Sequence, residues 1–391
     1  MWKIAAFALA LCAFTLSQKT AMQRPDAPPL AAPGAHAVGV RTLQLTDPAR
    51  ARGLTVEVWY PARRATGAAQ PAVYKGVVGS VEFDLPGQAL RDAAPEAGKF
   101  PLLVYAHGQP GSRYQSAYLM EHLASRGFVV AAIDHTGSLY RDLTQQAYVT
   151  SLVDRPLDIL FVLGQVPKSL PSADGDTVGL IGYSYGGYSV LNAAGVGIER
   201  AGLEQYCQQA GNEGPCFLLP FLAQVEPQRG AQMVRPDPRV KAVFVIAPYG
   251  APWYYGSLPR LEVPLFVAVG EEDDVATYAR DGLEVYRRAG SKAKYLLTLA
   301  GARHNPFVVC PPEVRANPED FERCWEPVWD KERLFDLARH FTAAFFQYHL
   351  KGEAQAGQYL EPGLPGFRPR AKVGIRLAAF AQRNTRLEHG R

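Results

Sequence analysis

The sequence lacks several features that mark particular protein classes. Its 391 residues carry 41 basic and 37 acidic side chains, and a net charge of +4 is too small to indicate a nucleic-acid partner. The apolar run at residues 4–16 is too short for a membrane-spanning helix, so the sequence is not that of a polytopic membrane protein. It holds no internal repeat and no low-complexity segment. Solenoid and fibrous architectures are therefore excluded.

The composition that remains is that of a globular protein. Hydrophobic residues make up 48% of the chain, aromatic residues 11% and charged residues 20%. This is ample material for a buried core. The length suits either two domains or one large α/β domain with insertions and tails.

Both ends of the chain differ from its middle. Residues 1–21, with Lys3 ahead of the apolar run, are typical of a secretory signal peptide, and the proline-rich residues 22–36 of a flexible leader. Residues 352–391 hold seven basic and three acidic residues. We expect this basic C-terminal tail to be solvated; it could contact an anionic membrane surface, although we do not expect it to.

Cysteine is scarce, with five residues. Without Cys12, which lies in the predicted signal peptide, four cysteines allow three pairings. Two short local pairs are the simplest, Cys207–Cys216 and Cys310–Cys324. Four free thiols are the alternative, and metal ligation is disfavoured because no Cys-x-x-Cys or closely spaced His/Cys set occurs. With the signal peptide, these pairs predict a secreted or periplasmic protein and no metal site.

Short apolar runs alternate with helical patterns through the middle of the chain. Strands are predicted at residues 38–45, 54–60, 102–106, 128–133, 178–181, 240–247, 265–269 and 295–299. Helices are predicted at residues 116–126, 153–165, 185–194, 278–289 and 331–350. The first two strands follow each other directly and later ones alternate with helices. This order indicates one α/β domain at residues 37–351, with a mostly parallel, doubly wound sheet and antiparallel N-terminal strands. The turn-rich residues 198–238 are predicted to be a cap-like insertion.

The strongest chemical signal is the motif Gly182-Tyr-Ser184-Tyr-Gly186. An apolar strand runs into it and a helical pattern follows, as in the nucleophile elbow of serine hydrolases. Small residues flank the serine because the turn is tight. We therefore predict that Ser184 is a nucleophile.

A serine nucleophile needs a base and an orienting acid, which follow it in this architecture in the order acid, then histidine. His304 lies just beyond the last predicted strand, where catalytic loops gather in open α/β sheets. The acid should follow the preceding strand, where Asp273 is favoured and Asp274 is the alternative.

The tetrahedral intermediate needs two N–H donors. Tyr185, which follows the nucleophile, is predicted to supply one, and Gln109 in the glycine-containing loop after the third predicted strand the other. His107 is predicted to brace that loop. Trp253 and Tyr254 are predicted to contact substrate, with simple packing as the equal alternative.

These stretches together resemble the α/β-hydrolase superfamily. The sequence is similar to plasma-type platelet-activating-factor acetylhydrolases and bacterial dienelactone-hydrolase-like esterases, with polyester-cleaving cutinases as a further relative. The stretches that carry the resemblance are residues 56–61, 105–108, 123–135, 155–158, 182–187 and the His304 loop. The acetylhydrolases carry their acid one strand earlier, where residues 247–250 hold no carboxylate. Asp273 matches dienelactone hydrolases and cutinases instead, and Ser184 stands where dienelactone hydrolases use cysteine.

The motifs and the resemblance together predict a secreted serine esterase that cleaves a small-molecule carboxylic ester through an acyl-enzyme, without a cofactor. A peptidase or amidase on the same triad, and a non-catalytic binding protein on a hydrolase scaffold, are the alternatives. The sequence leaves the substrate's acyl and alcohol groups and the oligomeric state open.

Overall fold

The computed structural model describes residues 24, 26–64, 70–211, 214–222, 235–362 and 374–381. The predicted signal peptide lies outside the described residues, as does most of the predicted tail. No helix among the described parts is both long and apolar enough to cross a membrane.

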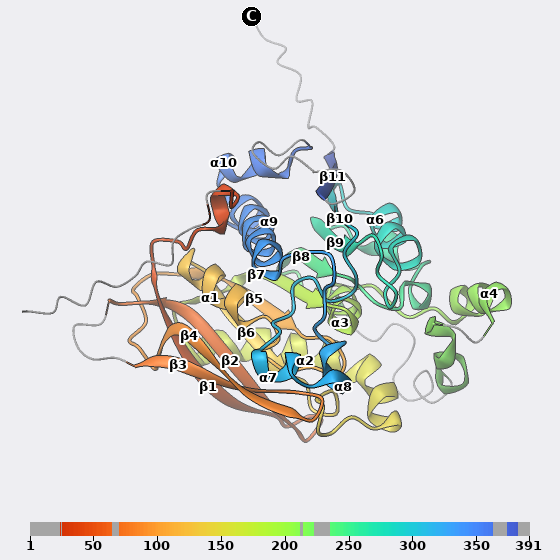
Figure 1. Cartoon of the computed structure of the whole chain (residues 1–391), viewed down its shortest axis with the longest axis horizontal. Helices are drawn as coiled ribbons and strands as arrows, with labels where there is room; N and C mark the ends of the chain where they lie inside the picture. Colours follow the sequence, from red (N-terminus) through yellow and green to blue (C-terminus); the bar gives the residue numbers. More distant parts are fainter. Residues whose placement is uncertain are drawn as a thin grey trace, which may run out of the picture.

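A single sheet in the order β11-β10-β9-β8-β7-β5-β6-β2-β1-β4-β3 organises the molecule (Figure 1). Strands β5 to β10 are parallel to their neighbours, whereas β2 joins β6 antiparallel and β11 joins β10 antiparallel. The strands are β1 (Ala37–Asp47), β2 (Arg52–Ala62), β3 (Pro71–Val78), β4 (Val81–Arg91), β5 (Phe100–Ala106), β6 (Val129–Asp134), β7 (Ala173–Tyr183), β8 (Val240–Ile246), β9 (Leu265–Gly270), β10 (Ala293–Ala300) and β11 (Gly374–Ala381).

Helices cover both faces of the sheet. One buried cluster joins the sheet to α2 and α3, and the other joins it to α1 and α9. The α-helices are α1 (Ala117–Ser125), α2 (Gln145–Ser169), α3 (Tyr185–Ala193), α4 (Arg200–Ala210), α6 (Glu284–Arg288), α7 (Pro312–Arg315), α8 (Pro318–Phe321), α9 (Lys331–Lys351) and α10 (Ala354–Gly357). The short 3₁₀ helices are η1 (Pro29–Ala31), η2 (Gly214–Leu218), η3 (Ala251–Trp253), η4 (Leu258–Arg260) and η6 (Gln358–Leu360), and η5 (Tyr278–Leu283) is a π-helix. This is the predicted doubly wound α/β fold, with antiparallel strands at its N-terminal end.

The described part of the predicted insertion at residues 198–238 forms α4 and η2. Figure 1 places α4 at the margin of the molecule, away from the central strands. The insertion is anchored to the domain through Trp253, whose indole nitrogen donates to the Pro215 carbonyl at 3.0 Å. Residues 212–213 and 223–234 are not described, so the cap stays a prediction.

The C-terminal segment differs from the prediction of a solvated tail. Its described residues 374–381 form β11, paired with β10 over the full strand. Ile375, Leu377 and Ala379 pack against the core, while Arg376 and Ala378 between them and Phe380 after them are exposed. This period of two is the pattern of a half-buried strand, and the basic residues around it obscured the signal.

Candidate active site

Ser184 occupies a tight turn between β7 and α3. Its φ of 54° lies in the left-handed region, where a residue with a side chain is strained. The two motif glycines make the turn possible, because a Cβ on Gly182 would lie 2.3 Å from the Gly186 oxygen, and one on Gly186 would lie 2.1 Å from the Ala106 oxygen. The Ser184 N–H donates to the Ile246 carbonyl on β8 at 2.8 Å, which anchors the turn to the sheet.

His304 follows β10 and its ring faces the serine. The Ser184 Oγ lies 3.0 Å from His304 Nε2, and both side chains are largely buried. A hydroxyl next to an imidazole nitrogen at this distance can donate its proton to it. The structure thus brings together two residues that lie 120 positions apart in the sequence.

Asp273 completes the chain of contacts. Both of its oxygens lie within 3.0 Å of His304 Nδ1, and Oδ1 also accepts the N–H groups of Val275 and Ala276. An acceptor at Nδ1 favours the tautomer in which Nδ1 carries the proton, so that Nε2 is free to accept one. The neighbouring Asp274 points to the surface, where it pairs with Arg303. The geometry therefore selects Asp273 over Asp274 as the partner of His304.

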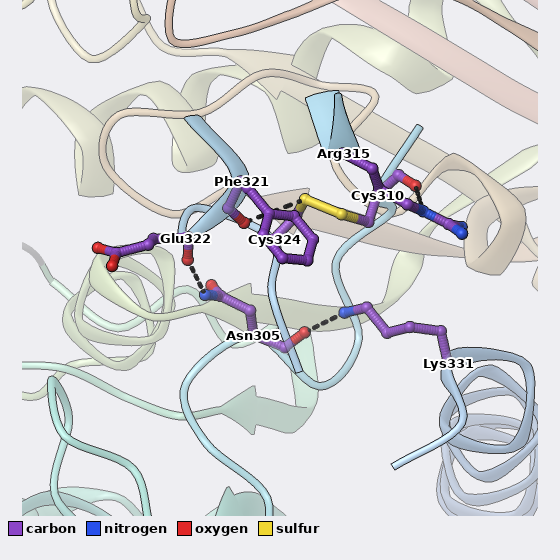
Figure 2. The surroundings of a disulfide bond; sticks show 7 residues. All are labelled: Asn305, Cys310, Arg315, Phe321, Glu322, Cys324 and Lys331. Carbon is purple, nitrogen blue, oxygen red and sulfur yellow. Dashed lines mark hydrogen bonds between the residues drawn. A yellow bond between two sulfur atoms is a disulfide. The ribbon is translucent and has the colours of Figure 1, made fainter. Parts of the chain in front are cut away.

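A loop closed by a disulfide bond holds the segment that carries His304, through contacts with the next residue, Asn305. The side chain of Asn305 donates to the Glu322 carbonyl at 3.0 Å, and Lys331 donates to the Asn305 carbonyl at 2.5 Å (Figure 2). Cys310 and Cys324 are bonded within this loop. The Tyr183 hydroxyl, next to the nucleophile, donates to Asn305 Oδ1 at 2.6 Å. Asn305 therefore links the serine turn, the histidine loop and the disulfide loop.

Sequence reasoning did not single out Tyr183 or Asn305. Both are direct neighbours of predicted site residues, and this adjacency was the only signal available. Their contacts depend on a loop conformation that no local pattern specifies.

Gln109 lies in the loop between β5 and α1, close to Tyr185. The Ser151 hydroxyl on α2 contacts both, at 3.3 Å from Gln109 Oε1 and 2.9 Å from the Tyr185 hydroxyl. The backbone N–H of Gln109 donates to no other described residue. An oxyanion donor needs an N–H that is unpaired in the free protein, and this role of Gln109 stays a prediction.

His107 braces this loop, in agreement with the prediction. Its Nδ1 lies 2.6 Å from the Gly108 carbonyl, and its Nε2 accepts the His135 N–H at 3.3 Å. Burial, reinforced by the nearby Arg155 charge and by His135, lowers the pKa of His107 well below its usual value. The ring is neutral at physiological pH and serves as a fixed donor to the Gly108 carbonyl.

Trp253 and Tyr254 are packing residues in this structure. Both are fully buried, and the Trp253 ring packs edge-on against Tyr185, Tyr188 and Tyr249. A side chain without exposed surface offers nothing to a ligand in this conformation. Their burial therefore does not support the predicted contact with substrate and agrees with the alternative, in which both side chains only pack in the core.

An apolar pocket of about 370 Å³ lies between the start of α2 and the insertion. It is lined by Leu143, Thr144, Gln145, Tyr148, Val149, Phe217 and Phe221. The Tyr148 ring packs edge-on against Tyr185 and Phe217, with both pairs of ring centroids 5.2 Å apart. Tyr185, which the Tyr148 ring contacts, directly follows Ser184 in the chain, but neither residue lines the pocket. Phe217 directly follows Cys216, which is bonded to Cys207.

Within the described residues, no group of three or more His, Cys, Asp and Glu side chains could hold a metal ion. The absence of a cofactor stays a prediction.

The comparisons with known proteins agree with this architecture. The family of platelet-activating factor acetylhydrolase, isoform II, matches residues 68–145, a stretch that includes the Gln109 loop but not Ser184, Asp273 or His304. Among solved structures, a ferulic acid esterase from Streptomyces cinnamoneus matches with a TM-score of 0.61 and 23% identity, over 88% of this chain and 97% of that chain. No curated protein matches the sequence. The chain therefore has the α/β-hydrolase fold, and its residues 68–145 are similar to the isoform II acetylhydrolase family, as the predicted resemblance implies.

Proposed function

We propose that the protein is a serine hydrolase that cleaves carboxylic esters through an acyl-enzyme. The observation that carries this proposal is the continuous chain of hydrogen-bonding contacts from Ser184 through His304 to Asp273. The similarities to an acetylhydrolase family and to an esterase structure support the ester class.

In the proposed mechanism, Ser184 Oγ attacks the ester carbonyl while His304 Nε2 takes its proton. Asp273 holds the ring and stabilises the imidazolium that forms. The N–H groups of Gln109 and Tyr185 stabilise the oxyanion. His304 then protonates the departing alcohol, and a water molecule activated by the same histidine hydrolyses the acyl-enzyme.

The pocket beside Tyr148 suggests which part of the substrate the protein recognises. Its lining is mostly apolar and includes three aromatic side chains, Tyr148, Phe217 and Phe221, so it suits a hydrophobic ring or short hydrocarbon chain. We propose that esters carrying such a group are cleaved more efficiently than the corresponding acetates. The name of the ferulic acid esterase, an enzyme for an aromatic acid ester, points the same way.

We also propose that the protein acts outside the cytoplasm, in the periplasm or after secretion. Two disulfide bonds support this location, because such bonds persist in oxidising compartments. The signal-like N-terminus is the second support.

Replacement of the nucleophile tests the proposal. Ser184→Ala should reduce the turnover of p-nitrophenyl acetate by more than about 10³-fold, because no other group can form the acyl-enzyme. Ser189→Ala is the matched control, since Ser189 is a buried serine on α3, the helix that follows Ser184, and its hydroxyl donates to the Tyr185 carbonyl. It should keep turnover within about threefold, as expected for a residue outside the chemistry.

Retained turnover in Ser184→Ala would refute the mechanism. Faster cleavage of an aminoacyl anilide than of its matched ester would instead favour a peptidase.

A further inference from the structure

Arg155, on α2, is fully buried directly behind the Gln109 loop. Its guanidinium donates through Nη2 to the His107 carbonyl and through Nη1 to the Gly108 carbonyl at 3.4 Å. The nearby carboxylate of Asp158 is bound by Arg50, Arg52 and His135. Arg155 therefore directs its charge to the backbone of the loop.

The contact with Gly108 bears on the predicted oxyanion donor. The Gly108 carbonyl and the Gln109 N–H belong to one peptide group, whose atoms lie in a plane. A positive group at the carbonyl oxygen fixes the direction of the N–H. It also draws electron density toward the oxygen, which makes the N–H a stronger donor.

The same guanidinium lies next to the second predicted donor. Its carbon is 5.2 Å from the centroid of the Tyr185 ring, within the range of a cation–π contact. Arg155 thus touches both segments whose N–H groups must converge on the oxyanion.

Other side chains also contact the backbone of Gly108, but they carry no positive charge. The Gly108 N–H is held by Gln115 Oε1 at 2.8 Å, and the neutral His107 ring is a closer donor to the Gly108 carbonyl than Arg155 is, with its Nδ1 2.6 Å away. Within the described residues, Arg155 provides the only full positive charge placed at these carbonyls. Burying a guanidinium is costly, and burial lowers the pKa of Arg155 to about 10. Such a cost is common where a group serves function more than stability.

We propose that Arg155 is a positioning residue that orients and polarises the Gly108–Gln109 peptide for oxyanion stabilisation. This inference rests on the proposed esterase function. Arg155 should therefore stabilise the transition state and contribute little to binding of the ester, because the negative charge on the carbonyl oxygen develops only in the transition state.

The test compares Arg155→Met and Arg155→Lys with the parent protein, using p-nitrophenyl acetate. Loss of an oxyanion donor costs about 10²–10³ in kcat, and a misdirected donor should cost less, about 10–100-fold. KM should stay within about threefold, since ground-state binding does not use the oxyanion. The kcat of Arg155→Lys should lie between those of the parent and Arg155→Met, because an ammonium group can donate to one carbonyl but lacks the planar, two-pronged geometry of a guanidinium.

Two further readouts separate positioning from a general structural role. The pH at which kcat/KM declines on the acid side should not move, because the Ser184–His304–Asp273 contacts remain. Affinity for a trifluoromethyl ketone, which forms a tetrahedral adduct, should fall in parallel with kcat/KM, while affinity for a non-reactive ether analogue should not. Tyr188→Phe is the control. It removes a buried hydrogen bond from Tyr188 on α3 to the Leu152 carbonyl on α2, the helix that carries Arg155, and should leave kcat unchanged.

A folded Arg155→Met with kcat within about threefold of the parent would overturn the inference, and so would equal losses in affinity for the ketone and the ether. If Arg155→Met does not fold, Arg155→Lys decides, and a kcat within twofold of the parent would count against the proposal. Retained turnover in Ser184→Ala would defeat the proposed function itself, whereas an inactive Ser184→Ala with unaffected Arg155 variants would defeat only this inference.

Discussion

At the scale of single residues, two adjacent carboxylates of identical chemistry have different environments. Asp273 is buried and accepts three N–H groups, including that of the histidine. Asp274 is half exposed and pairs with Arg303 at the surface. An exposed ion pair contributes little, whereas a buried carboxylate beside an imidazole fixes its tautomer. The two side chains should therefore differ sharply in their effect on turnover.

Exchange of each aspartate for asparagine measures that difference. In Asp273→Asn, the amide can donate to the histidine and favour the wrong tautomer, so we expect kcat to fall by about 10³–10⁴-fold. In Asp274→Asn, only a surface ion pair is lost, and we expect kcat within about threefold. Steady-state kinetics on one ester decides. Comparable losses in the two variants would contradict the assignment of Asp273.

At the scale of elements, most strands and longer helices were predictable from the sequence because each carries a clear apolar run or apolar periodicity. Each predicted strand, from residues 38–45 to residues 295–299, is present within a few residues. The β3–β4 hairpin was missed because apolar Val73 lies at an exposed position of β3 and Gly76 at a buried one, while Pro86 in β4 is disfavoured in strands. Strand β11 was missed because basic residues surround it.

The predictability of the site follows the same division. Ser184, Asp273 and His304 each follow a strand at the same edge of the sheet, and strand order alone places such residues together. Trp253 and Tyr254 also follow a strand, but their burial depends on tertiary packing, which for Trp253 includes contacts with Pro215 and Phe217 of the insertion. The contacts of Arg155 and Asn305 run between segments distant in sequence, which no local pattern records.

The two disulfide loops support different elements of the site, so their removal should have separable effects. Loss of Cys310–Cys324 by double serine substitution should lower kcat, because the Glu322 carbonyl that holds Asn305 lies in that loop. Loss of Cys207–Cys216 should raise KM for an ester with a phenyl group and leave the hydrolysis of acetate nearly unchanged, because Phe217 lines the pocket. Kinetics on both esters gives the comparison.

Each double variant is the control for the other. Both loops are short, and either removal should destabilise the protein by about 2–3 kcal/mol, so stability alone cannot explain a kinetic difference. The same change in kcat and KM for both variants would contradict separate roles.

At the scale of the whole molecule, buried neutral histidines couple stability to pH. His340 on α9 is fully buried, and its Nδ1 accepts the Leu30 N–H at 3.1 Å. Burial, with a smaller contribution from Arg126, lowers its pKa to about 3. Between pH 6.5 and 3 the unfolded chain therefore binds a proton here that the folded protein does not. Stability should decline as pH falls below 6.5 and be unaffected above it.

Replacement of this residue tests the coupling. His340→Gln retains an acceptor for Leu30 and cannot titrate, so its free energy of unfolding should fall less steeply below pH 6.5, by up to about 1.4 kcal/mol per pH unit. Urea unfolding between pH 7.5 and 5 measures the slope. His36→Gln, at a partly exposed site beside Glu96, serves as the comparison. Equal slopes in the parent and His340→Gln would show that His340 is not the coupled group.

The most direct test of the central claim, that Ser184 is a nucleophile activated by His304, is covalent labelling. After treatment with a fluorophosphonate, intact-mass measurement should show one adduct per chain, and peptide mapping should place it on Ser184. The His304→Gln variant should label far more slowly, because no base remains to take the hydroxyl proton. No adduct on Ser184, or an adduct formed at the same rate without His304, would contradict the account.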